Sequence, residues 1–215
     1  EDSTGFWLID ADGTNKRRIL PYQLTNPAWS PDGNWIAFSR NAQICIMPFD
    51  GEKFDTTSIV QLTSEGRNFF PSWSPDGERI AYNRSICDGP ETCGIWLVDI
   101  NNGVNEFIAS YGNYPSWHNS NDSIVYSTNA LSSNGEDIGD SLWLYSFSNN
   151  ENYLLKFISL PNYDNRYFMY SPDNKRIGFV SSYESGEGIQ LCITNNKGEG
   201  LEKLTHNGSL KFSWS

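Results

Sequence analysis

Histidine, acidic and cysteine side chains could do chemistry in this sequence, but they are few and scattered. Of the two histidines, His118 stands in a turn and His206 begins a connector, so His206 is the better candidate for a general base or ligand. Glu136, Asp137 and Asp140 could hold calcium, although a solvated acidic loop explains them better. The sequence contains no Gly-x-Ser-x-Gly, His-Glu-x-x-His or phosphate-binding glycine loop. We therefore expect no catalytic residue, no metal site and no cofactor.

The four cysteines fall into two contexts. Cys87 and Cys93 bracket a short, turn-rich loop, and we expect a disulfide between them, which would imply an oxidising compartment. The alternative is a pair of free thiols in a cytosolic loop. Cys45 and Cys192 lie in apolar stretches, where a small buried hydrophobic residue is the expected role. The spacing of the four does not favour zinc.

Composition limits the classes of partner. The chain has 215 residues, is 14% aromatic and carries a net charge of −11, which disfavours nucleic acid and anionic membranes because both attract basic patches. No apolar run is long enough to span a membrane, and no signal peptide is visible, as in a chain from which a signal has been removed.

A repeated stretch, Trp-Ser-Pro-Asp-Gly, organises the whole chain. It begins at Trp29 and Trp73, recurs in altered form at Trp117 and Tyr170, and starts again at Trp214. The successive spacings are 44, 44, 53 and 44 residues, which is the length of a propeller blade. Pro, Asp and Gly in this order favour a tight turn between two strands, so each copy predicts a hairpin.

Each repeat predicts four strands. A strand containing the Trp is followed by one with an Ile and an aromatic residue two positions later, then by an apolar third strand and a fourth strand. We therefore expect an all-β fold, a β-propeller of four-stranded antiparallel blades, in a single domain 1–215. The expected complete blades are 26–63, 70–110, 113–159 and 167–205, with partial blades at 6–20 and 210–215.

The two partial blades allow two interpretations of how the propeller ring is completed. Joining 6–20 to 210–215 would close a ring of five blades, but the joined blade would lack its second strand. Alternatively, the chain is a segment of a longer propeller.

The motif also resembles a known family. Pro-x-Trp-Ser-Pro-Asp-Gly, followed by x-Ile-Ala-Phe, a strand ending in Asp-Gly, and Leu-Thr, is similar to the WD40-like repeats of TolB-type β-propellers. The resemblance covers essentially the whole chain and is closest in the first two repeats. It implies the fold more than the activity, because propellers of this kind serve many functions.

The loops of such a propeller divide between two faces. We name the strands of a blade A to D from the axis outward. The A–B and C–D turns form a repetitive face, here called the turn face, and the B–C and D–A loops form a variable face, where a scaffold usually carries function. The candidate ligand-binding residues on the variable face are Arg67, Phe69, Tyr111, Tyr114, Tyr163, Arg166 and His206.

These residues favour a non-enzymatic, TolB-like binding scaffold for a protein, peptide or glycan, located outside the cytoplasm. One alternative is an accessory propeller domain of a larger hydrolase such as a serine peptidase. The resemblance allows this, because similar propellers occur before serine-peptidase domains. A propeller lyase with a central metal is less favoured, because the two histidines fall on opposite faces.

Overall fold

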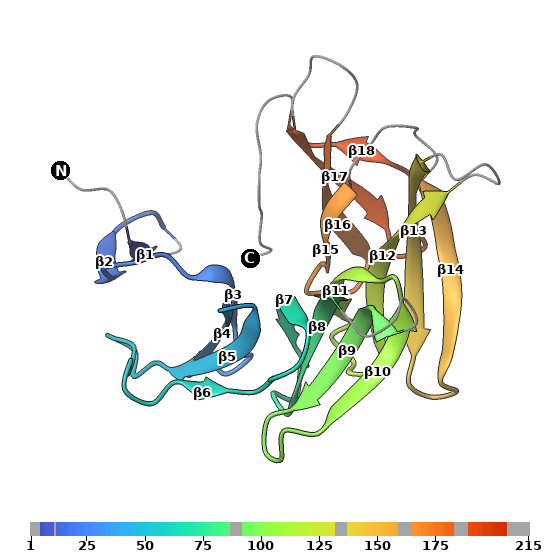
Figure 1. Ribbon diagram of the computed structural model, residues 1–215. Helices are drawn as coiled ribbons and strands as arrows, with labels where there is room; N and C mark the ends of the chain where they lie inside the picture. Colours follow the sequence, from blue (N-terminus) through green and yellow to red (C-terminus); the bar gives the residue numbers. More distant parts are fainter. Residues whose placement is uncertain are drawn as a thin grey trace.

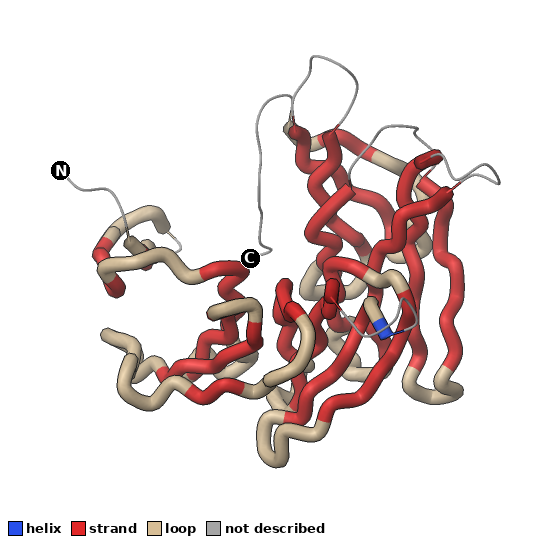
Figure 2. Tube along the Cα trace, viewed as in Figure 1, coloured by secondary structure: helices blue, strands red, loops and turns tan. Residues whose placement is uncertain are grey.

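The protein is all β, with four four-stranded antiparallel blades in a propeller ring. The computed structural model describes residues 5–10, 12–86, 92–131, 137–158, 165–182 and 189–205. Figure 1 shows the blades following one another around the axis. Figure 2 shows that the described part consists almost entirely of strands and turns. Among these residues no helix is long and apolar enough to cross a membrane.

The strands follow the predicted order, A to D in each blade. A two-stranded sheet comes first, formed by β1 (Phe6–Leu8) and β2 (Arg17–Leu20). Blades 1 and 2 comprise β3 (Thr25–Trp29), β4 (Trp35–Arg40), β5 (Gln43–Pro48) and β6 (Val60–Gln61), then β7 (Arg67–Trp73), β8 (Arg79–Ile86), β9 (Gly94–Asp99) and β10 (Asn105–Ser110). Blades 3 and 4 comprise β11 (Asn113–Trp117), β12 (Ser123–Leu131), β13 (Asp137–Ser146) and β14 (Glu151–Ile158), then β15 (Asn165–Tyr170), β16 (Arg176–Ser182), β17 (Ile189–Asn195) and β18 (Glu202–Lys203).

The Ser-Pro-Asp-Gly copies form the predicted hairpin turns. In blade 1, Ser30 Oγ donates to Asp32 Oδ1 at 2.6 Å and accepts from the Trp35 backbone NH at 2.9 Å. The same two bonds recur at Ser74 and Ser171, in blades 2 and 4. The Ser30 hydroxyl bond holds the pKa of Asp32 below its ordinary value. The turn face is therefore explained by turn formation.

The core lies between blades. The aligned isoleucines of the four B strands are completely buried, and the aromatic residues two positions later are at most 3% exposed: Ile36, Ile80, Ile124, Ile177, Phe38, Tyr82, Tyr126 and Phe179. Each B-strand residue packs into a cluster shared with the neighbouring blade, except in blade 1, whose neighbour is the β1–β2 sheet. Burial of these apolar faces orders the blades around the axis.

The A-strand tryptophans of blades 2 and 3 also tie these blades to the ones before them. Trp73 Nε1 donates to the Ala28 carbonyl and Trp117 Nε1 to the Ser72 carbonyl, both at 3.1 Å. These bonds fix neighbouring A strands at the axis, where their remaining side chains form the candidate site.

Candidate functional site

One position in every A strand has a left-handed backbone. It lies three residues before the last aromatic residue of the strand and is occupied by Asn26, Phe70, Tyr114 and Tyr167, whose φ angles are 51°, 56°, 51° and 59°. The ladder to the B strand shifts register at each of these positions. A left-handed conformation costs an aromatic residue about 1–2 kcal/mol, whereas Asn adopts it more readily. Aromatic residues take it at this level in blades 2, 3 and 4, and Asn26 takes it in blade 1.

The aromatic rings at this level contact one another. The ring centre of Phe70 lies 4.6 Å from that of Tyr114 and 5.8 Å from that of Tyr167, and the two tyrosine rings are 5.1 Å apart. Because these residues come from three blades, their contact joins β7, β11 and β15 at the axis. We call Phe70, Tyr114 and Tyr167 the axial ring cluster.

A cavity of about 750 Å³ extends from the axial ring cluster toward the turn face. Its wall combines the A strands with prolines of the Ser-Pro-Asp-Gly turns, Pro31, Pro75 and Pro172. Trp73 and Trp117 also line it. The cavity is therefore aromatic at one end and bounded by rigid turns at the other.

The structure brings some of the predicted site residues to this cluster. Tyr114 belongs to it, and the Phe69 ring centre lies 6.3 Å from that of Phe70. The exposed Arg67 guanidinium lies 5.8 Å from the centre of the Phe69 ring. β7 thus carries a continuous path of side chains from the variable face to the axial ring cluster. The sequence predicts these residues in the D–A loops of the variable face, but β7 and β11 extend far enough to include them.

The other predicted residues do not join this cluster. Tyr111 is 60% exposed and lines a different pocket, between blades 2 and 3. Arg166 is exposed and lies in β15, next to Tyr167 of the cluster. Tyr163 and His206 lie outside the described residues.

The sequence analysis missed Phe70 and Tyr167. Phe70 was assigned to a predicted strand and Tyr167 to the start of another, with no special role for either. The available signal was their shared position three residues before the repeat aromatic, which Tyr114 also has. A left-handed backbone at a bulky residue contradicts local preference, so only the folded chain shows that the position is special.

His118 has a structural role. His118 replaces the turn serine of blade 3, where its Nδ1 contacts the Ser120 hydroxyl and lies 3.4 Å from Asp122 Oδ1. Its ring also packs edge-on against Tyr170, with centres 4.9 Å apart. Among the described residues no group of three or more His, Cys, Asp or Glu side chains could hold a metal ion. Glu136 lies outside them.

The cysteines divide as the sequence suggested, as far as they are described. Cys93 is disulfide-bonded, whereas Cys45 and Cys192 are free, with exposures of 2% and 1%. Cys45 and Cys192 pair with the B-strand aromatics at the position that Trp96 occupies in blade 2. Cys87 lies outside the described residues, so its pairing with Cys93 stays a prediction.

Comparison with known proteins identifies the type of propeller. No protein-family model matches the sequence, and no curated protein matches it either. Among solved structures, TolB from Acinetobacter baumannii is similar with a TM-score of 0.71 and 22% identity, over 93% of this chain and 48% of that protein. A putative TolB from Agrobacterium tumefaciens has a TM-score of 0.58 and 15% identity, over 92% of this chain and 86% of that one.

The same fold also occurs in enzymes. An oligogalacturonate lyase from Vibrio parahaemolyticus is similar with a TM-score of 0.60 and 14% identity, over 94% of this chain and 60% of the lyase. The chain is a β-propeller, and its architecture is that of the TolB-type propellers. It spans about half the length of the A. baumannii TolB. At sequence identities of 14–22%, these similarities show a shared fold and nothing more.

Proposed function

We propose that this chain is a non-enzymatic binding propeller that holds a peptide segment of a partner protein at the axis. The peptide enters from the variable face. The observation that carries this proposal is the axial ring cluster, built on a strained backbone position at one level of the propeller. Register shifts of this kind occur next to binding and active sites, where they aim a side chain, and here they aim three aromatic rings at the axis. Aromatic rings supply contact area at low conformational-entropy cost.

The path along β7 supports entry from the variable face. Arg67 is exposed at the start of this path and can bind a carboxylate of the peptide with two parallel hydrogen bonds. Phe69 and Phe70 then lead to the cluster. We include Tyr163, Arg166 and His206 in the same proposed surface.

The proposal predicts loss of binding when the path is cut. Peptides selected from a random display library on the wild-type protein should bind an Arg67→Ala, Phe69→Ala double variant at least about tenfold more weakly, because aromatic and arginine contacts dominate such interfaces. Isothermal titration of the selected peptides measures this. An Asn34→Ala variant, altered at an exposed turn-face residue, is the control. If the control loses binding and the double variant keeps it, the turn face is the entry.

A second candidate function is that of an accessory propeller in a larger hydrolase. It is favoured by similarity to a puromycin-hydrolyzing peptidase of Mycobacterium tuberculosis, with a TM-score of 0.61 and 10% identity, where the match covers 91% of this chain and 31% of the peptidase. Failure to select any peptide, together with a peptidase domain in the flanking gene sequence, would favour this alternative.

We also propose that the chain works outside the cytoplasm. The disulfide at Cys93 supports this, because disulfides persist in oxidising compartments. Peptide mapping without reductant, on protein recovered from its native compartment, should find Cys93 linked to Cys87, with Cys45 and Cys192 reduced. A free thiol at Cys93 in that protein would contradict an extracytoplasmic location.

A further inference from the structure

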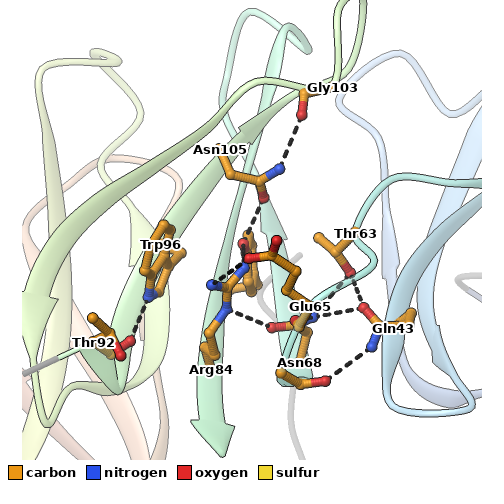
Figure 3. Close-up of polar contacts among 11 residues, drawn as sticks. Gln43, Thr63, Glu65, Asn68, Arg84, Thr92, Trp96, Gly103 and Asn105 are labelled. Atoms are coloured by element: carbon orange, nitrogen blue, oxygen red, sulfur yellow. Dashed lines mark hydrogen bonds and ion pairs between the residues drawn. The ribbon is translucent and has the colours of Figure 1, made fainter. Parts of the chain in front are cut away.

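Polar side chains fill the junction between blades 1 and 2 near the variable face (Figure 3). Asn68 is completely buried, and its Nδ2 donates to Gln43 Oε1 at 2.8 Å and to Thr63 Oγ1 at 3.0 Å. Its Oδ1 accepts a bond of 3.3 Å from Arg84 Nε. A side chain with this many partners holds its neighbours in one arrangement.

Arg84 occupies an aromatic setting within this junction. The side chain is 7% exposed, and its guanidinium carbon lies 4.0 Å from the centre of the Trp96 ring. One terminal nitrogen donates to the Tyr82 hydroxyl at 3.3 Å, and the other lies 3.9 Å from a carboxylate oxygen of Glu65. The chain thus contains its own example of a guanidinium bound to an indole face beside a phenol hydroxyl.

The junction between blades 2 and 3 repeats the aromatic part of this arrangement. Tyr82 pairs with Trp96 across β8 and β9, and Tyr126 pairs with Trp143 in the same register across β12 and β13. The Tyr126 hydroxyl donates to Asn152 Oδ1 in the D strand at 2.8 Å, and the Tyr82 hydroxyl donates to Asn105 Oδ1 in its D strand at 2.6 Å. No residue in the described part of the chain donates a hydrogen bond to the Tyr126 hydroxyl oxygen, which can therefore accept one.

The arrangement of Gln43, Asn68 and Arg84 is not repeated at this second junction. The register of the B and C strands places Thr128 where blade 2 has Arg84, and Gly94 where blade 1 has Gln43. The position of Asn68, five residues before the repeat tryptophan, is taken by Gly112. Neither glycine has a side-chain amide like those of Gln43 and Asn68, and the threonine is too short to cover the indole.

A pocket of about 700 Å³ lies at this junction, lined by Tyr126, Thr128, Trp143, Gly94 and Gly112. Trp143 Nε1 donates to Thr128 Oγ1 at 3.1 Å, which fixes the indole ring. The pocket therefore keeps the aromatic platform on which blade 2 binds Arg84, but Thr128 stands at the equivalent position of blade 3. Arg84 itself lines the blade 2 side of the pocket and is bound to Trp96 of its own blade.

Asn83 adds a further acceptor to the pocket wall. Its Nδ2 donates to the Gly112 carbonyl at 2.7 Å, and its Oδ1 accepts no bond from the described residues. The net charge of −11 attracts cations to the protein as a whole.

We propose that this pocket binds a guanidinium group, such as an arginine side chain of a peptide, stacked on Trp143 with a hydrogen bond to the Tyr126 hydroxyl oxygen. Asn83 Oδ1 accepts a second bond. The site is separate from the axial ring cluster and does not depend on the function proposed for it.

Calorimetric titration with N-acetyl-arginine amide tests the proposal. We expect saturable binding to the wild-type protein and affinity lower by at least about tenfold for the N-acetyl-citrulline amide, which has the same shape without the charge. This comparison needs no variant. Absence of saturable binding, or equal affinity for the two amides, would overturn the proposal.

Two variants place the binding in the pocket. Thr128→Arg restores the arrangement of blade 2, so its own guanidinium should compete and lower the affinity by at least about tenfold. Thr56→Arg adds the same charge at an exposed position and should bind like the wild type. Circular dichroism checks that both variants fold. Unchanged binding by a folded Thr128→Arg variant would show that the site is elsewhere, and the Arg67→Ala, Phe69→Ala variant should bind normally.

Discussion

Replacing Asn68 with alanine is expected to lower the free energy of unfolding by about 3 kcal/mol. The change removes hydrogen bonds from Asn68 Nδ2 to Gln43, Thr63 and the Glu65 carbonyl, at 2.8, 3.0 and 2.8 Å. It also leaves Arg84 Nε without its 3.3 Å acceptor inside a closed junction. A buried donor that loses its partner costs the full desolvation of that group. Urea denaturation measures the effect.

The control for this prediction is Asn196→Ala. Asn196 is exposed in the turn after β17, and its backbone NH bond to the Lys175 carbonyl, 2.9 Å long, survives the change. The free energy of unfolding of the Asn196→Ala variant should stay within about 0.5 kcal/mol of that of the wild type. Equal effects of the two substitutions would mean that the blade 1–2 network does not stabilise the ring.

Replacing Gly94 with alanine should cost about 3 kcal/mol or more. Gly94 begins β9 with a φ of 145°, a backbone conformation that side chains rarely adopt. An added Cβ would lie 1.9 Å from the Ala109 carbonyl oxygen and 2.8 Å from the Tyr111 backbone nitrogen, so β9 and β10 would have to separate. Thermal unfolding followed by circular dichroism measures the loss.

Gly103→Ala separates backbone strain from the clash at Gly94. Gly103 also has a positive φ, of 71°, but an added Cβ there meets nothing within 4 Å. We expect only the left-handed penalty of about 1 kcal/mol at this position. A cost at Gly94 no larger than that at Gly103 would show that β9 and β10 can separate freely.

Most of the blade architecture could be predicted from local patterns. The turn sequence appears with its own hydrogen-bond partners, since Ser30 and Asp32 bond to each other and to nearby backbone. The alternation that placed Ile80 and Tyr82 on one strand face needed only the period of a β-strand. Both residues are completely buried, as expected.

The candidate sites were only partly predictable. The sequence predicts Arg67 and Tyr114 as ligand-binding residues, and that role stays a prediction. In the structure their connection runs through Phe70, whose position depends on a left-handed backbone. Likewise, Tyr111 gave no sign that it lines the blade 2–3 pocket rather than the axial surface. Such a pocket depends on what two neighbouring blades leave unfilled.

The repeat, the hairpins and the buried strand faces can be read from the order of residues, because these features depend on residues within one blade. The contents of the junctions cannot be read in this way. Arg84 and Thr128 occupy the same position in successive repeats, yet one fills its junction and the other leaves a pocket. The physical reason is that each junction combines side chains about 44 residues apart, and their fit is a property of the packed ring.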